Sequence, residues 1–185
     1  MRPIFMMKPI PVVLLFASPL FNQPAFGQDD AAAARTAAGC GSDQVHFDVK
    51  TDKKHHPAPQ PETGKALIYV FQEVRQGELW IFATITTKVG LDGAWVGANH
   101  GDSYFFFAAN PGNHRVCAAW QSTSEVYSKL ASAADLTIEP GKVYYLRVKV
   151  YDREYKPQLK MEHVDPAEAQ LLIAASSFNA SHPRK

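Results

Sequence analysis

The feature that most constrains this chain is a run of short apolar segments punctuated by tight-turn residues, from Thr86 to Trp120. Within it, Asp92-Gly93 predicts a two-residue type I′ hairpin, because both turn positions need a positive φ and these residues tolerate it. A turn at that point also fixes the register, so that Val89 faces Val96 and both side chains lie on one face. The run is therefore expected to form consecutive antiparallel β-strands.

Segments inside and outside this run follow the same pattern. Ala66 to Phe71 and Tyr104 to Phe107 are apolar on both parities, so both faces of each strand should be covered. Leu136 to Ile138 is expected to begin a strand pair that turns at residues 139–142, where Pro-Gly suits a type II turn. Val143 to Tyr151 alternates in the manner of a half-buried antiparallel strand.

The C-terminal part adds one helix. Asp165 suits the N-cap and Pro166 the first helical position, so a helix should run to about Ser176. Residues 179–185 are largely polar and are expected to fray as a tail. Together these signals predict an all-β fold over residues 64–178, an antiparallel β-sandwich of about seven strands with one C-terminal helix.

The first 27 residues have the layout of a secretory signal peptide. Arg2 and Lys8 supply the basic region, Pro9 to Phe21 the apolar region, and Ala25-Phe26-Gly27 the small residues of a cleavage site. The apolar region is too short and too rich in proline for a transmembrane helix, which needs about 20 residues. The mature chain should begin near Gln28 and reside in the periplasm or outside the cell.

Charge argues against two classes of partner. The chain has 19 basic and 18 acidic residues, and removal of Arg2 and Lys8 with the signal leaves 17 against 18, a formal charge of −1. Proteins that bind nucleic acids or anionic lipids usually carry a strongly basic patch or stripe. Neither partner is therefore expected.

Residues 28–63 are expected to form a mobile N-terminal arm. Gln44 to Val49 alternates and predicts one short strand, whereas Lys50 to Gly64 combines three prolines with charged residues and is typical of an extended linker. The pair His55-His56 is interpreted as solvated, because no third metal ligand stands at a usable spacing.

Two cysteines remain in the exported chain, and an even count in an oxidising compartment favours a disulfide between Cys40 and Cys117. Such a bridge would tie the arm to the sheet. Two alternatives stay open. Cys117 could be a buried free thiol. Cys40 could be lipidated, since Ala38-Gly39 precedes it, although the apolar region ends far upstream at Phe21.

No catalytic motif occurs in the sequence. The patterns G-x-S-x-G, S-x-x-K, H-E-x-x-H and C-x-x-C and a phosphate-binding glycine loop are all missing. The isolated histidines are interpreted as surface or turn residues; they are His46, His100, His114 and His163. The protein is therefore predicted not to be an enzyme and to need no cofactor or metal.

Trp95 and Tyr145 are the candidate binding residues. Trp95 lies on the parity opposite to Val96, so a core Val96 places Trp95 on the outer face. An exposed tryptophan there could stack on a sugar ring or on an apolar surface of a partner. Tyr145 is outward by its own parity. The alternative for Trp95 is that it covers the helix or the N-terminal arm.

Five segments occur in a characteristic order: GKALIYV from Gly64, VGLDGAWVG from Val89, SYFFF from Ser103, PGNH from Pro111 and EPGKVYY from Glu139. In this order the chain resembles a bacterial family of exported proteins with a domain of unknown function, many of them lipoproteins, over roughly residues 64–150. The turn and strand elements are also similar to small surface-layer-type modules with a Pro-Glu-Gly-Ala signature, which form β-sandwiches. The shared residues are mostly turn glycines and core aromatics, so the resemblance implies a fold and no catalytic residues.

These observations lead to one principal hypothesis. The protein is predicted to be an exported, non-enzymatic β-sandwich that acts as an accessory or interaction module of the bacterial cell envelope. The alternative is a carbohydrate or cell-wall binding module that uses Trp95 and Tyr145.

Overall fold

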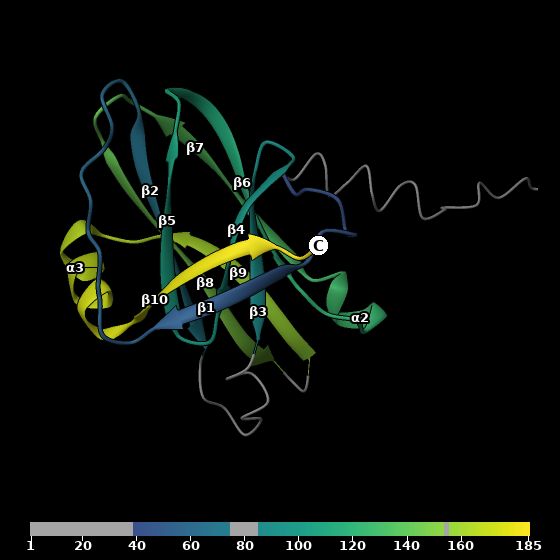
Figure 1. The fold of residues 1–185 in the computed structure, drawn as a ribbon. Coiled ribbons are helices and arrows are strands. Elements are labelled where there is room, and N and C mark those ends of the chain that lie inside the picture. The colour runs from purple at the N-terminus through teal and green to yellow at the C-terminus, as the bar shows by residue number, and fades with distance from the viewer. Residues whose placement is uncertain (1–38, 75–84, 154–155) are drawn as a thin grey trace, which may run out of the picture.

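The structure, a computed structural model, describes residues 39–74, 85–153 and 156–185. The predicted signal peptide, the first part of the arm and Trp80 lie outside these ranges. The described residues form ten β-strands in two sheets and two helices (Figure 1). The prediction of a mainly β fold is confirmed, but seven strands and one helix were too few.

The larger sheet has six strands in the order β1 (Phe47–Asp52), β10 (Ser177–Pro183), β5 (Ser103–Ala109), β2 (Ala66–Val74), β8 (Val143–Arg153) and β9 (Lys156–His163). The smaller has four, in the order β4 (Ala94–His100), β3 (Thr86–Leu91), β6 (Gly112–Trp120) and β7 (Ala131–Ile138). The helices are α2 (Glu125–Ser128), which leads into β7, and α3 (Pro166–Ala175), which leads into β10.

The main hydrophobic core lies between the two sheets. Its buried members come from β2, β5, β8 and β9 on one side and from β3, β6 and β7 on the other; among them are Ile68, Val70, Phe105, Leu146, Val148, Met161, Val89, Val116, Leu136 and Ile138. Phe105 and Phe107 point into this core, whereas Tyr104 and Phe106 point to the opposite face, as strand alternation predicts.

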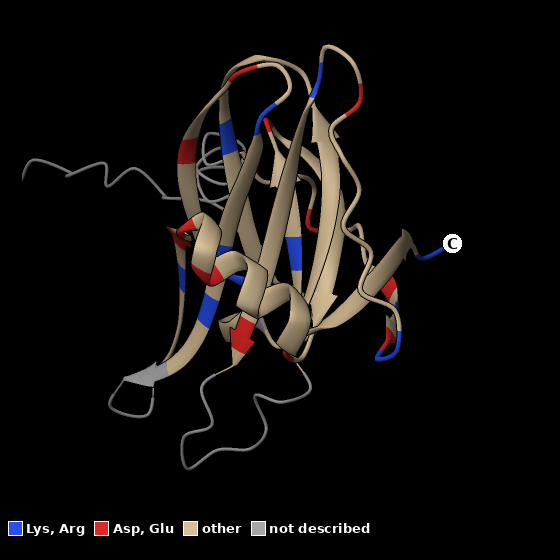
Figure 2. Cartoon of the chain, turned by 90° about the vertical axis from the view of Figure 1, so that its left-hand side faces the viewer, with Lys and Arg blue, Asp and Glu red and all other residues tan. Residues whose placement is uncertain are grey.

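A second core covers the outer face of the six-stranded sheet beneath α3. It contains Leu67, Tyr69, Phe71, Tyr104, Ala169 and Ile173. Figure 2 views this face, with α3 lying in front of the strands. The helix begins as predicted, since the Asp165 carboxylate accepts a hydrogen bond from the Ala167 N–H at 2.8 Å and Pro166 holds the first position. Strand β2 is thus covered on both faces, as predicted from its apolar residues on both parities.

A charged cluster lies beside this core on β8. Arg147 pairs with Glu162 of β9 at 2.6 Å, with Glu168 of α3 at 2.6 Å and with Glu73 of β2 at 3.2 Å. Lys149 reaches Glu162 at 2.5 Å. The cluster therefore ties β8 to β2, β9 and α3.

The predicted turn at Asp92-Gly93 is confirmed, with φ values of 50° and 88°. The predicted register is correct as far as Gly90 opposite Trp95, but Val89 lies opposite Gly97 because the ladder shifts by one residue between Val89 and Gly90. The pairing of Val89 with Val96 is therefore wrong. The shift places Gly97 against the Phe105 ring, where a Cβ would stand 2.5 Å from a ring carbon. A β-bulge of this kind re-aims the following side chains.

Three further expectations need correction. The sheet is not purely antiparallel, because β2 pairs with β8, and β10 with β5, in parallel. The turn at residues 139–142 does not close a strand pair, since β7 and β8 belong to different sheets. The predicted polar tail forms most of strand β10, whose residues 178–183 pair with β1. Its buried Asn179 donates from Nδ2 to Ser103 Oγ at 2.6 Å, so a polar strand is accommodated there.

Candidate functional site

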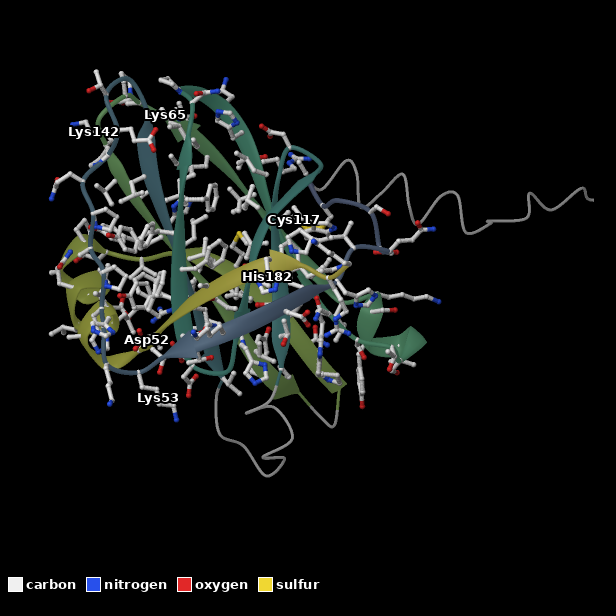
Figure 3. The ribbon with its side chains drawn as sticks, viewed as in Figure 1. Asp52, Lys53, Lys65, Cys117, Lys142 and His182 are labelled. Atoms are coloured by element: carbon white, nitrogen blue, oxygen red, sulfur yellow. A yellow bond between two sulfur atoms is a disulfide. The ribbon has the colours of Figure 1, made fainter. Side chains whose placement is uncertain are left out.

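The Cys40–Cys117 disulfide fixes residues 39–46, the first described part of the N-terminal arm, on the outer face of the four-stranded sheet. Figure 3 labels Cys117 where the arm meets the sheet. Cys40 and Cys117 are 1% and 0% exposed, and the Gly93 N–H donates to the Gly39 carbonyl at 3.1 Å. The predicted disulfide is confirmed. In this state neither sulfur is a free thiol or can carry a lipid.

The residues around Cys40 are glycines because the arm passes close to the sheet. A Cβ on Gly39, whose φ is 79°, would stand 2.5 Å from the Arg115 carbonyl oxygen. A Cβ on Gly41 would stand 2.6 Å from Cδ1 of the Trp95 indole. Real Cβ atoms do not approach other atoms so closely, so the sequence Gly-Cys-Gly is what lets the arm lie flat.

Trp95 lies on the outer face, as predicted, but the arm occupies it. The indole Nε1–H donates to the Ser42 carbonyl at 2.7 Å, and the ring packs against the Cys40–Cys117 cluster. The Lys88 ammonium lies 4.4 Å from the ring centroid, within range of a cation–π contact. Trp95 is therefore half-buried against the arm. This agrees with the alternative interpretation, in which Trp95 covers the N-terminal arm and is not an exposed binding residue.

Tyr145 lies on the other side of the molecule. Its ring packs among those of the second core, 5.4 Å from Tyr69 and 6.5 Å from Phe71 by centroid distance. Its hydroxyl accepts a hydrogen bond from Gln170 of α3 at 3.3 Å. Because Tyr145 and Trp95 lie on the outer faces of different sheets, the structure does not bring the two candidates together in one site.

An open groove of about 560 Å³ lies on the four-stranded sheet. It is lined by Gly39 of the arm, Asp92 of the β3–β4 turn, and residues of β6 and β7: Asn113, His114, Arg115, Asp135, Leu136 and Thr137. We call it the β6–β7 groove. Its polar side chains make it the best candidate for a functional site.

Two cross-strand pairs form the floor of the β6–β7 groove. Asn113 stands opposite Thr137, and Arg115 opposite Asp135. The Thr137 hydroxyl donates to Asn113 Oδ1 at 2.9 Å. Arg115 donates to both Asp135 oxygens, from Nε at 2.7 Å and from Nη2 at 3.1 Å. These hydrogen bonds raise the pKa of the Arg115 guanidinium and lower that of the Asp135 carboxyl. Each pair is therefore held in a defined geometry.

Asp92 and His114 form the end of the groove nearest the hairpin. Asp92 Oδ2 lies 2.6 Å from His114 Nδ1, and Oδ1 accepts from the Arg115 N–H at 2.8 Å. Partial burial raises the pKa of Asp92, but the Arg115 N–H and the His114 ring stabilise the carboxylate and lower this pKa by more. His114 Nε2 lies 2.9 Å from the Asn110 carbonyl. Both ring nitrogens of His114 therefore face an oxygen atom of the protein.

Sequence reasoning missed this groove. It treated His114 as an isolated residue beside a turn, although Asp92 lies 22 residues upstream and becomes its partner only through the pairing of β3 with β6. The Asp-Gly turn and the PGNH segment were visible signals, but nothing in their spacing shows that they meet.

The placement of the other histidines bears on metal binding. His100 pairs with Thr86 Oγ1 at 2.9 Å and does not line the groove. Among the described residues, no group of three or more His, Cys, Asp or Glu side chains is placed to hold a metal ion. The same residues contain no helix long and apolar enough to cross a lipid bilayer.

Comparison with known proteins identifies one family. The family described as "Protein of unknown function (DUF2846)" matches residues 62–159, which is more than half of the 185-residue chain. The match runs from the residues before β2 into β9, so it includes the β6–β7 groove apart from Gly39. No curated protein and no solved structure matches the chain.

Proposed function

We propose that this chain, which belongs to the DUF2846 family of proteins of unknown function, is an exported, non-enzymatic interaction module of the bacterial cell envelope. The observation that carries this proposal is the disulfide-held arm. The arm makes its contacts with the sheet around the Cys40–Cys117 bond, and structural disulfides persist in oxidising compartments such as the periplasm. Export to such a compartment keeps the disulfide oxidised and therefore keeps the arm on the sheet.

The state of the β6–β7 groove supports a binding role over a catalytic one. A general base needs a ring nitrogen or carboxylate oxygen within reach of a substrate proton. Both ring nitrogens of His114 face protein acceptors, and the Asp92 carboxylate already accepts two hydrogen bonds. Groups held in this way keep their positions, which suits recognition of a partner.

The alternative function is a carbohydrate or cell-wall binding module. The sequence suggested it through Trp95 and Tyr145, but in the structure the β6–β7 groove supports it instead. Trp95 and Tyr145 lie on opposite faces, whereas the groove collects amide, hydroxyl, carboxylate and guanidinium groups on one face. Side chains of this kind are the usual hydrogen-bonding groups for polar ligands in protein pockets.

Position-specific photo-crosslinking in intact cells tests the proposed function. A photoreactive amino acid would replace Thr137, which lines the groove, and in a matched control it would replace Thr51, an exposed threonine of β1. We expect an ultraviolet-dependent adduct with an envelope component from position 137 and none from position 51. The protein should also be released by osmotic shock without free thiols. Cytoplasmic retention, or equal labelling at both positions, would contradict the proposal.

A further inference from the structure

We propose that the β6–β7 groove binds a neutral, hydroxyl-rich ligand of the oligosaccharide class. This inference rests on the proposed function as a binding module and specifies the site and the ligand chemistry. It differs from the carbohydrate hypothesis drawn from the sequence, because it involves neither Trp95 nor Tyr145.

The charged and titratable side chains of the groove form two internal pairs, Asp92 with His114 and Arg115 with Asp135. The side chains of Arg115 and Asp135 are 47% and 73% exposed, so a ligand in the groove would meet both. An anionic ligand would be repelled by the aspartates and a cationic one by Arg115, and either would have to compete with a pair already formed. Neutral ligands avoid this cost.

The side chains of the groove keep some hydrogen-bonding capacity for a ligand. Asn113 uses its oxygen to accept from Thr137, so its amide nitrogen can still donate. Asp135 accepts two hydrogen bonds from Arg115, and a carboxylate has about four lone-pair sites. The groove therefore offers a donor on one cross-strand pair and acceptors on the other. A hydroxyl group, which both donates and accepts, matches this arrangement better than a group that does only one.

The Asn113–Thr137 and Arg115–Asp135 pairs are two residues apart along the same strands, which corresponds to about 7 Å. A ligand that contacts both pairs must carry hydroxyl groups along an extended length, as a chain of sugar rings does. Because the pairs are already held by their own hydrogen bonds, binding would cost little side-chain entropy.

Isothermal titration calorimetry on the oxidised, exported protein tests this inference with three tetrasaccharides of different charge. The probes are the N-acetylglucosamine tetramer, which is neutral, its deacetylated counterpart, which is cationic, and tetragalacturonate, which is anionic. We expect the neutral tetramer to bind more tightly than either charged one. Tighter binding of a charged tetramer would overturn the inference.

Two variants locate the site, with a matched control. Asp135→Asn removes the anionic acceptor and Asn113→Ala removes the amide donor, and each should raise the Kd of the neutral tetramer about fivefold or more, the effect of one lost hydrogen bond. Asp48→Asn changes another exposed aspartate that pairs with an arginine, Arg184, at 2.8 Å, and should leave the Kd unchanged. Unchanged Kd values in both groove variants would overturn the proposed site.

The outcomes also separate this inference from the proposed function. If none of the tetrasaccharides binds but crosslinking from position 137 yields an envelope adduct, the ligand class is wrong and the interaction module stands. If both experiments give nothing, both proposals fail.

Discussion

The disulfide between Cys40 and Cys117 is expected to supply a large part of the stability of this fold. The perturbation is its reduction in the wild-type protein, which leaves both side chains in place, compared with the double variant Cys40→Ala/Cys117→Ala. If the covalent link is what matters, reduction alone should lower the free energy of unfolding by nearly as much as the double substitution does.

The magnitude follows from the length of chain that the bond closes. The cysteines are separated by 77 residues, and the loop-closure relation then gives about 4.5 kcal/mol of stabilisation through the restricted unfolded state. Domains of this size are usually stable by about 5–15 kcal/mol in total. With a urea m-value of about 2 kcal/mol/M, reduction should lower the unfolding midpoint by about 2 M.

The assay is urea unfolding followed by tryptophan fluorescence, with and without a dithiol reductant. Reduction should also release the arm before global unfolding, because Trp95 would lose its contacts with Ser42 and Cys40. A red shift of the emission at low urea would report this release, and Trp95→Phe should abolish it. A midpoint that moves by less than about 0.5 M on reduction would refute the reasoning.

Three further perturbations should affect stability in the same assay. Gly41→Ala places a Cβ 2.6 Å from Cδ1 of Trp95 and should cost about 1–3 kcal/mol through overpacking. Glu162, whose pKa is lowered from 4.5 to about 2 chiefly by the hydrogen bond from Lys149, stabilises the fold in its ionised form, so this contribution is complete above about pH 5 and is lost as the pH falls toward 2. Asp165→Ala removes the N-cap of α3 and should cost about 1 kcal/mol.

Each of these expectations has a result that would contradict it. Gly41→Ala with wild-type stability would mean that the arm can move away from the indole. The variant Glu162→Gln should flatten the acid limb of the stability profile, so an unchanged profile between pH 5 and pH 2 would show that other groups determine it. For α3, Asp165→Asn serves as the control, because asparagine is also a good N-cap and should retain most of the stability that alanine loses.

Local sequence signals were sufficient where the structure depends on neighbouring residues. The Asp92-Gly93 turn, the N-cap at Asp165 and the two-faced strand at Tyr104 to Phe107 all formed as predicted. In each case the determining interaction is short in sequence: a backbone conformation, a side-chain cap or alternation along one strand. The disulfide could also be predicted, because the chain offers one pairing for its two cysteines.

The candidate site could not be predicted in this way. Its contacts join Gly39, Asp92 and the strands β6 and β7, and no sequence spacing relates these segments. Trp95 was placed on the correct face, but its coverage depends on Ser42 and Gly41 of an arm that was expected to be mobile.

The sequence by itself thus determined which segments form strands and turns at most positions, which faces are apolar, and that the two cysteines should pair. Only the tertiary structure decided that β2 and β8 pair in parallel, that the turn at residues 139–142 joins two sheets and that the polar C-terminal segment becomes β10. The physical reason is that strand pairing is made by backbone groups, which every residue carries, so the choice of partner depends on the packing of the whole chain. The β6–β7 groove is a product of that choice.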